Sequence, residues 1–497
     1  QGEFLESLGE AARRSSPVLF FVEDNQWAIS TSTAGKTFFS IGGAEPDEFH
    51  GIKIHRIDGR DVVSAAEQLQ SIVATMREHR RPEIVVFRVE RLSSHTNADD
   101  HTIYRTAGDL EEVTESGDAL ARLESYLIQH GYDEERLQQL REEVATEVAA
   151  CEERAFQGAD PKPILTAKAS IGAELGNALA KPEQDVCDPL TMKDAIREVL
   201  RNKLAHDERV VMLGEDIEDP KGDVFGLTRG LSTQFNGRVQ NSPLSESTII
   251  GTSVGRALAG QRPVAFIQFA DFLPLALNQI MLDMGTMWWR TDGAWTTPVI
   301  VMVPCGGYRP GLGPFHSHSI ESVLAHTPGL DVFMPSSAED AAGMLNAAFQ
   351  SARPTIFFYP KAALNNPQRA TTVDVTKHVT PIGRSRKVRS GRDITFVAWG
   401  NTVRLCQTAA DALEEAAIDS EIIDLRSISP WDQEAVLASA EKTSRVVVVH
   451  EDNHTCGLGG EVLATIAEKS RVPVSVRRVT RADTYVPCNF SKQLDVL

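Results

Sequence analysis

Residues 243–272 read PLSESTIIGTSVGRALAGQRPVAFIQFADF, and residues 305–319 read CGGYRPGLGPFHSHS. In the first stretch Glu246 stands just ahead of an apolar, glycine-containing run, and a strand-like segment that begins at Pro263 closes with Phe272. The second stretch is a glycine- and proline-rich loop that leads into His316. A carboxylate at a helix start, an aromatic ring at a strand end and a histidine on a loop are together typical of a catalytic pocket.

Helices and strands alternate around these two stretches. Residues 191–194 have the pattern of a capping box, and apolar residues then recur at helical spacing. Strands are expected at Val210–Leu213, Pro263–Phe269, Pro298–Val303, Asp331–Met334 and Thr355–Tyr359, and, from Gly383 onward, at Ile394–Ala398, Glu421–Leu425, Val446–Val449 and Val474–Val479. Strands that alternate with helices favour parallel sheets, so we predict two successive α/β domains here.

The N-terminal part has the same alternation. The continuous apolar run Val18–Val22 predicts a buried strand of a parallel sheet, and polar residues 23–30 follow it, at the strand end where open α/β sheets bind ligands. Further elements are expected as helices at 3–14 and Val62–His79 and strands at Gly51–Ile57 and Glu83–Val89. Residues 111–156 are charge-rich and helical, with an intermittent apolar stripe made of Leu120, Leu123, Leu127, Leu137 and Leu140.

These patterns divide the chain into three α/β domains. Residues 158–190 hold four prolines among Gly, Ala and Lys and predict a linker. We therefore expect one domain over 1–157, a second over 191–370 and a third over 371–497. No repeat of sequence between the first two is legible.

Composition restricts the classes of partner. A net charge of −19 argues against a nucleic-acid surface, and no apolar run is long enough to span a bilayer. The six cysteines show no metal-ligand spacing, which favours buried structural cysteines in a reducing compartment. No signal peptide is visible at Gln1-Gly2-Glu3-Phe4, so we expect a cytoplasmic protein, and the abrupt start and end suggest truncation at both termini.

Several motifs, in this order, resemble the β subunit of thiamine-diphosphate-dependent 2-oxo acid dehydrogenases, the decarboxylating first components of the pyruvate and branched-chain complexes. The resemblance covers about 190–497 and rests on Pro243–Glu246, Phe269–Phe272, His316–Ser319, His326–Leu330, Ala398–Gly400 and Gly457–Gly460. Residues 1 to about 157 resemble the C-terminal part of the partner α subunit, through Glu23–Ser30 and the loop from His95 to Arg105. The resemblance implies a fused α–β chain with thiamine-diphosphate-binding domains of parallel-sheet, three-layer type and a transketolase-like C-terminal domain.

The resemblance also implies roles for individual residues. Glu246 would hydrogen-bond the aminopyrimidine ring nitrogen of thiamine diphosphate, in an apolar pocket formed by Leu244 and Phe272. Asn25 would give its side-chain oxygen, and Trp27 its carbonyl, to Mg2+. His95 and His316 would flank the thiazolium ring as catalytic histidines. Arg91 and Arg105 would hold the diphosphate, or would order the loop by bidentate pairing with Asp99 or Asp100.

Each motif also has an interpretation without catalysis. Ser245 or Glu246 can simply cap a helix, Asn25 can belong to an ordinary turn, and His95 can be a solvated loop residue. His316 and His318 can bind a metal from one face of a strand. The glycines at 457–460 are not a full nucleotide-binding loop, and we interpret them as a turn that starts a helix.

The implied function is oxidative decarboxylation of a 2-oxo acid, with 3-methyl-2-oxobutanoate favoured over pyruvate, and reductive acylation of a lipoyl group on the dihydrolipoamide acyltransferase core. The family's α2β2 assembly implies a homodimer. Alternatives are a pyruvate or acetoin dehydrogenase, a transketolase-like transferase, and an assembly subunit without catalysis. One departure supports the last of these: the family's Gly-Asp-Gly, whose acid holds magnesium, should lie just ahead of Gln1, and without it the chain is not expected to bind the cofactor normally.

Overall fold

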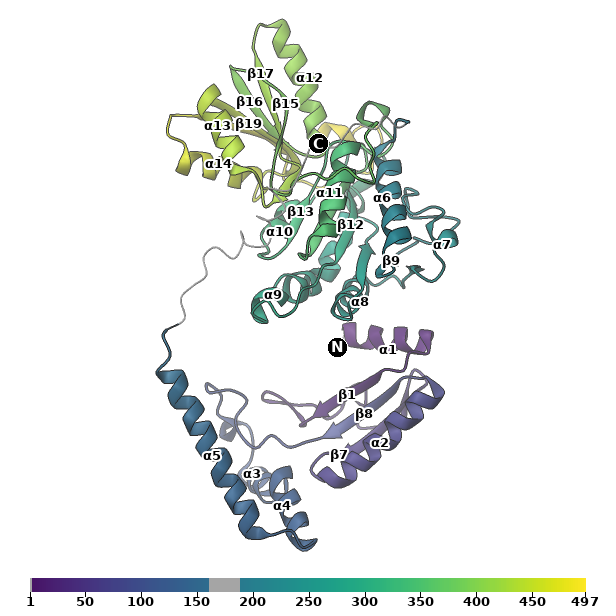
Figure 1. The fold of residues 1–497 in the computed structure, drawn as a ribbon, viewed down its shortest axis with the longest axis vertical. Coiled ribbons are helices and arrows are strands. Elements are labelled where there is room, and N and C mark those ends of the chain that lie inside the picture. The colour runs from purple at the N-terminus through teal and green to yellow at the C-terminus, as the bar shows by residue number, and fades with distance from the viewer. Residues whose placement is uncertain (1, 161–187) are drawn as a thin grey trace. The chain divides into compact units, whose positions relative to one another are not determined.

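The structure is a computed structural model that describes residues 2–160 and 188–497. The chain divides into two compact units, Gln1–Pro163 and Ile164–Leu497, and each is described by itself (Figure 1). Most of the predicted linker at 158–190 lies outside the described residues. None of the helices formed by residues 2–160 and 188–497 combines the length and apolar character that a bilayer span requires.

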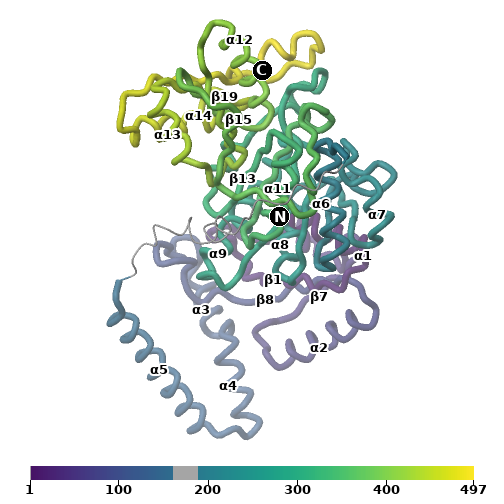
Figure 2. The backbone as a smooth tube through the Cα atoms, turned by 45° about the horizontal axis from the view of Figure 1, so that its top comes forward, coloured from purple at the N-terminus to yellow at the C-terminus, as the bar shows by residue number. Residues whose placement is uncertain are grey.

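The first unit is a three-layer α/β domain. Its sheet has the order β1-β8-β7-β6, in which β1, β8 and β7 are parallel and β6 is antiparallel to β7. Helices α1 and α2 lie on opposite faces of this sheet (Figure 1 and Figure 2). Helix α1 packs on one face through Leu8, and α2 packs on the other through Ile72 and Met76. The main elements are α1 (Gly2–Arg14), β1 (Leu19–Asp24), β6 (Glu48–Phe49), β7 (Ile52–Asp58), α2 (Val62–His79), β8 (Glu83–Arg88), α3 (Ala107–Ser116), α4 (Ala119–Gln129) and α5 (Glu134–Phe156).

One expectation for this unit is wrong. Strand β1 is the edge strand of the described sheet, and Phe21 is 40% exposed, so the run from Val18 is not buried on both faces. The leucine stripe of 111–156 does lie on helices, but neither α4 nor α5 has a buried residue. Small β-hairpins and a 3-10 helix complete the unit: β2 (Trp27–Ala28), β3 (Thr31–Ser32), β4 (Lys36–Thr37), β5 (Ser40–Ile41) and η1 (His101–Ile103).

The second unit begins with a seven-stranded sheet of order β10-β9-β11-β12-β14-β13-β18, parallel except for β18. The Thr191 side chain caps α6 by accepting from the Asp194 backbone N–H, as the capping box predicts. Helices α6 and α11 cover one face of the sheet. The elements are α6 (Met192–His206), β9 (Val210–Gly214), α7 (Leu231–Gln234), β10 (Val239–Asn241), α8 (Glu246–Leu258), β11 (Arg262–Phe266), η2 (Ala270–Ala276), η3 (Gln279–Met284), α9 (Met287–Arg290), β12 (Ile300–Cys305), η4 (Gly313–Phe315), α10 (Glu321–Ala325), β13 (Asp331–Phe333), α11 (Ala338–Gln350), β14 (Thr355–Pro360) and η5 (Pro367–Arg369).

A five-stranded sheet of order β15-β17-β16-β19-β20 completes the second unit, with β15 antiparallel. The sheets of this unit are parallel, as predicted, except that β15 and β18 each add an antiparallel edge strand. The glycines at 457–460 lead into α14, as expected. The elements are β15 (Arg386–Arg389), β16 (Ile394–Ala398), α12 (Thr402–Glu415), β17 (Ser420–Asp424), β18 (Ser427–Ser429), α13 (Gln433–Thr443), β19 (Arg445–Asn453), α14 (Gly459–Lys469), β20 (Ser475–Arg481) and η6 (Gln493–Val496).

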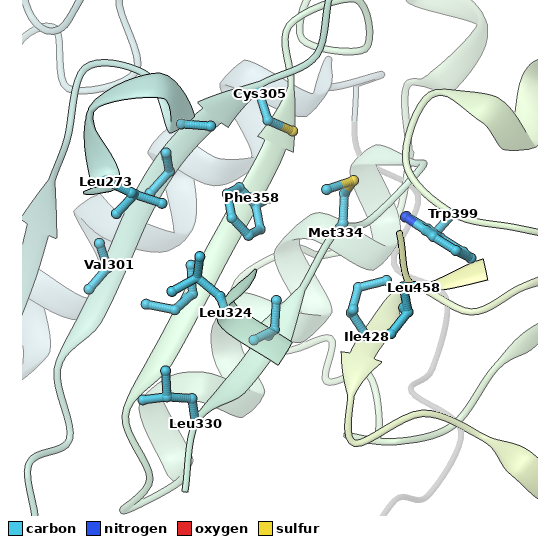
Figure 3. Close-up of a cluster of buried hydrophobic side chains, with 14 of the residues drawn as sticks. Leu273, Val301, Cys305, Leu324, Leu330, Met334, Phe358, Trp399, Ile428 and Leu458 are labelled. Atoms are coloured by element: carbon cyan, nitrogen blue, oxygen red, sulfur yellow. The ribbon is translucent and has the colours of Figure 1, made fainter. Parts of the chain in front are cut away.

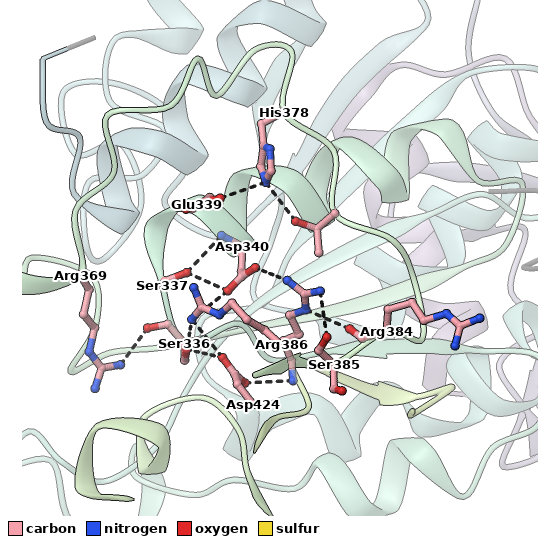
Figure 4. A network of polar contacts seen from close by, with 12 residues as sticks. Ser336, Ser337, Glu339, Asp340, Arg369, His378, Arg384, Ser385, Arg386 and Asp424 are labelled. Carbon is pink, nitrogen blue, oxygen red and sulfur yellow. Dashed lines mark hydrogen bonds and ion pairs between the residues drawn. The ribbon is translucent and has the colours of Figure 1, made fainter. Parts of the chain in front are cut away.

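One continuous apolar cluster joins the two sheets of the second unit. Phe358 and Cys305, on strands of the first sheet, share it with Trp399 and Leu458 from the C-terminal region (Figure 3). A buried ionic network lies at the same junction: Asp340 pairs with both Arg386 and Arg426, and the Ser336 hydroxyl donates to Asp424 (Figure 4). Because both apolar and charged groups cross the junction, the C-terminal domain is positioned rigidly on the first sheet.

Candidate active site

The candidate site in the second unit lies at the carboxyl ends of adjacent parallel strands. Glu215 directly follows β9, Gln268 and Phe269 follow β11, and the loop to His316 follows β12. Such strand ends meet at one edge of the sheet, where backbone turns can present side chains to a ligand.

Glu246 is the first residue of α8, and it lies near a second carboxylate. Ser245 is the N-cap, but its side chain makes no capping hydrogen bond; its hydroxyl instead donates to Thr248 Oγ1 at 2.9 Å. Burial, and to a smaller extent the charge of Glu246, raise the pKa of Glu215 to about 7, against the opposing effect of a hydrogen bond from the Gln268 backbone N–H (3.3 Å). A buried carboxyl that titrates near neutrality beside a second carboxylate can hold or release a proton there.

His316 is held between aromatic rings. Its imidazole lies edge-on to Phe269, with ring centroids 4.6 Å apart, and to Phe272 at 5.7 Å. Its Nδ1 lies 3.4 Å from the Leu312 carbonyl oxygen, which can only accept, so Nδ1–H is the donor in this contact. Phe272 belongs to η2, and α8 packs against η2, so the helix that carries Glu246 and the segment that supports His316 are in contact.

The structure thus brings Glu246, Phe272 and His316 into one connected site. The residues that link them by contact are Glu215, Gln268 and Phe269. It does not do so for Leu244, which is 82% exposed. His318 faces other groups: Arg481 Nη1 donates to its Nδ1 at 3.2 Å, and its backbone N–H donates to Asp271 at 3.3 Å. His316 and His318 therefore have separate partners.

In the first unit, the residues after β1 form a compact turn. The Asn25 side-chain oxygen accepts from the Trp27 backbone N–H at 3.0 Å. The Trp27 ring packs against Tyr104 with centroids 5.7 Å apart, and the Arg105 guanidinium lies 5.6 Å from the Trp27 ring centroid. The turn of Asn25 and the loop that carries His95 are therefore built on each other.

The loop that carries His95 is ordered by Tyr104. The Tyr104 hydroxyl donates to Asp99 Oδ2 at 2.7 Å and accepts from Arg91 Nη2 at 2.7 Å, and the His95 backbone N–H donates to the same Asp99 oxygen at 2.8 Å. The His95 side chain itself is exposed.

The predicted pairing of Arg91 or Arg105 with Asp99 or Asp100 is wrong. Arg91 Nη1 donates to the Ile29 carbonyl at 2.9 Å and Arg105 Nε donates to Asp109. Asp100 accepts from Thr102. Arg105 finds a closer partner because Asp109 lies four residues on, at the start of α3, and this i,i+4 spacing was legible in the sequence.

Comparison with known proteins assigns both units. Three family models match in succession: the dehydrogenase E1 component over 1–168, the pyrimidine-binding domain of transketolase over 188–367, and the transketolase C-terminal domain over 383–497. A Bacillus subtilis protein named 2-oxoisovalerate dehydrogenase subunit beta is 39% identical over 276 residues, which are 55% of this chain and 83% of that protein. The chain belongs to the 2-oxo acid dehydrogenase E1 family. This E1 chain carries an α-type region and a β-type region in one polypeptide.

Other relatives of this E1 chain have two kinds of name. The 3-methyl-2-oxobutanoate dehydrogenase subunit beta of Mycobacterium tuberculosis is 37% identical over 66% of this chain and 94% of its own length. The pyruvate dehydrogenase E1 component subunit beta of Leifsonia xyli is 38% identical over 63% of this chain and 92% of its own. A solved structure described as a split-gene transketolase, an inactive β4 tetramer, matches with a TM-score of 0.51 at 22% identity, over 62% of this chain and 92% of its own, and shows a shared fold.

Sequence reasoning missed three residues of this candidate site: Glu215, Phe269 as a ring that supports His316, and Lys361, whose ammonium donates to the His316 carbonyl. Glu215 could have been predicted from the sequence, since a polar residue soon after the apolar run Val210–Leu213 marks a strand end. The expectation of buried cysteines is right for Cys305 and Cys406 but wrong for Cys151, Cys456 and Cys488, which are exposed.

Proposed function

We propose that this chain catalyses the oxidative decarboxylation of a 2-oxo acid and passes the acyl group to a lipoyl-lysine of an acyltransferase core. The observation that carries the proposal is the second-unit site: Glu246 at the start of α8, beside the buried Glu215, next to the strand end from which Phe269 and Phe272 support His316. A carboxylate, a proton-storing carboxyl and an oriented imidazole are the acid–base groups that this chemistry needs.

The residues present fit thiamine diphosphate. Glu215 Oε1 is buried and has no hydrogen-bond partner among the residues that the structure describes, and Leu244 presents an exposed apolar side chain next to Glu246. The protonated Glu246 carboxyl would donate a hydrogen bond to the aminopyrimidine ring nitrogen, and Leu244 and Phe272 would contact its apolar ring. When bound, thiamine diphosphate supplies the electron sink for loss of carbon dioxide.

The first unit would hold the charged end of the cofactor. The Asn25 side-chain oxygen accepts one hydrogen bond and keeps a second lone pair, so it can bind Mg2+ together with the Trp27 carbonyl oxygen. Arg91 would bind the diphosphate. His95 and His316 would each donate a proton to the substrate or the lipoyl group near neutral pH.

We favour 3-methyl-2-oxobutanoate as substrate over pyruvate, supported by the names of the Bacillus and Mycobacterium relatives. The preference depends on pocket volume, where one methylene contributes about 1–3 kcal/mol. The partner would be the lipoyl domain and core of the acyltransferase, and the working form a homodimer equivalent to α2β2. The domain bounds that we propose, 1–157, 191–370 and 371–497, lie close to the matched families.

The test is turnover of the full-length protein with thiamine diphosphate and Mg2+, measured as 2-oxo acid-dependent reduction of an artificial electron acceptor. 3-Methyl-2-oxobutanoate and pyruvate are compared in parallel. Glu246→Gln should lower kcat by about 100-fold or more with the thermal midpoint of unfolding unchanged, and His316→Ala by about 10- to 100-fold. Wild-type protein that neither turns over nor binds the cofactor by calorimetry would show a non-catalytic assembly subunit instead.

A further inference from the structure

Lys361 is a buried lysine that the proposed mechanism does not use. It follows β14, its backbone N–H donates to the Cys305 carbonyl at 3.1 Å, and its side chain is 6% exposed. Burial lowers its pKa to about 8, while Asp271 and Glu451 are among the charges that oppose this effect. Burying a charged ammonium group is energetically unfavourable, so a buried lysine normally has specific partners.

The partners of Lys361 are two parts of the His316 site. Its ammonium donates a hydrogen bond to the His316 carbonyl oxygen, and the same nitrogen lies 5.1 Å from the centroid of the Phe269 ring. Phe269 is the ring that packs edge-on to the His316 imidazole at 4.6 Å. One cation therefore fixes both the backbone of His316 and the aromatic ring against which its side chain rests.

The far end of the same loop is fixed by an acid that faces Lys361. Glu451, on β19, accepts a hydrogen bond from the Gly307 backbone N–H, and the Lys361 charge lowers the pKa of Glu451 against the larger effect of burial. The loop from Cys305 to His316 is thus held at its start by the Glu451 carboxylate and at its end by the Lys361 ammonium.

We propose that Lys361 is a positioning residue for His316: it sets the imidazole orientation by holding the His316 carbonyl and the Phe269 ring, with Glu451 as the counter-charge. The proposal rests on the proposed function, in which His316 touches substrate. Lys361 does not itself contact the reacting atoms. Its removal should misplace His316 without changing how substrate and cofactor bind.

The kinetic test is a double-mutant cycle in the full-length protein. Lys361→Met keeps the side-chain length and removes the charge and the donor; kcat should fall about 10- to 100-fold with KM and cofactor affinity unchanged, because small misplacements of a catalytic group have effects of this size. In a His316→Ala background the same substitution should change kcat by less than about twofold. Lys203→Met is the matched control, since Lys203 lies 5.7 Å from the Phe349 ring on the α6 side of the sheet and should leave kcat unchanged. Equal losses in both backgrounds, or a change in KM alone, would overturn the proposal.

A second readout needs no turnover. Carbethoxylation of His316 by diethylpyrocarbonate, followed by peptide mass spectrometry, should be about fivefold faster or more in Lys361→Met and unchanged in Lys203→Met. Lys361→Arg keeps a cation and donors and should give an intermediate rate, which decides the matter if the Met variant does not fold. If the wild type is inactive but shows this labelling pattern, the proposed function is wrong and the positioning role of Lys361 stands. An unchanged labelling rate in both Lys361 variants would overturn the positioning role.

Discussion

The two histidine-bearing loops of this chain are ordered in different ways. The loop that carries His95 is held mainly by its own residues, through Tyr104, Asp99 and Arg91, and His95 is exposed. The loop that carries His316 is held by groups from far along the chain: Lys361, Glu451 and the C-terminal Gln493. Local contacts permit a loop to open without disturbing the domain, whereas distant ones make its geometry depend on the packing of the whole unit.

The largest expected difference between the surroundings of the two loops is in how the free energy of unfolding depends on pH. Glu321, which begins α10 just after the His316 loop, is fully buried, and burial together with the charge of Asp452 raises its pKa to about 8 from an ordinary 4.5. As pH rises, Glu321 loses its proton in the unfolded chain near pH 4.5, whereas in the folded chain it keeps the proton until about pH 8. Between these two values the free energy of unfolding therefore falls, by up to several kcal/mol. Hydrogen bonds from Tyr104 and the His95 backbone lower the pKa of Asp99. The stabilisation that ionised Asp99 gives to the folded chain is therefore lost as pH falls, the opposite direction from Glu321.

Glu321→Gln should flatten the fall in the thermal midpoint of unfolding between pH 5 and pH 8. The Trp399 indole N–H, which donates to Glu321 at 2.9 Å, keeps an acceptor in the variant. Asp99→Asn serves as the control and should show the same fall in the thermal midpoint between pH 5 and pH 8 as the wild type. A wild-type midpoint that rises from pH 5 to 8, and rises equally in Glu321→Gln, would contradict this assignment.

The next effect in size is that of Gln493→Ala. Its buried amide donates to the Gly307 and Arg309 carbonyls at 2.7 and 3.1 Å and accepts from Gly311 N–H at 2.8 Å. Loss of these bonds should lower the free energy of unfolding by about 2–4 kcal/mol and speed amide exchange of peptide 305–318. Gln433→Ala, which removes an exposed partner of Lys469, is the control and should do neither.

A smaller and local effect is expected for Tyr104→Phe. The substitution removes the hydroxyl that joins Arg91 to Asp99, so amide exchange in 91–105 should become about five- to tenfold faster. The midpoint of global unfolding should stay the same, since these contacts lie within the loop. A shift of several degrees would mean that the His95 loop is not locally ordered.

The smallest effect concerns salt. The His95 loop is ordered by the partly exposed charges of Arg91 and Asp99, and raising ionic strength from about 0.05 to about 0.5 M should speed its amide exchange by about twofold. The His316 loop is held by buried groups and should not respond. Equal responses in the two loops would remove the distinction between them.

The sequence was sufficient for most elements and for part of the site. Helix α2 was predicted to the residue, and the predicted strands of the second unit lie within four residues of the observed bounds at either end, because their apolar runs are long and bounded by polar residues. Strands β10, β15 and β18 were missed, since short edge strands have little pattern of their own. Glu246, Phe272 and His316 were predicted as candidate site residues through motifs, but Lys361 was not, because its proposed role depends on a carbonyl 45 residues away.

Strand β18 has a consequence for how this polypeptide can be divided. It lies beyond residue 383, where the match to the C-terminal family begins, yet it pairs with β13 as the last strand of the preceding sheet. A fragment cut at the family boundary would leave β13 as a bare hydrophobic edge, a template for aggregation. Recombination or expression of the two halves as separate modules is therefore disfavoured, and they are expected to be inherited as one piece.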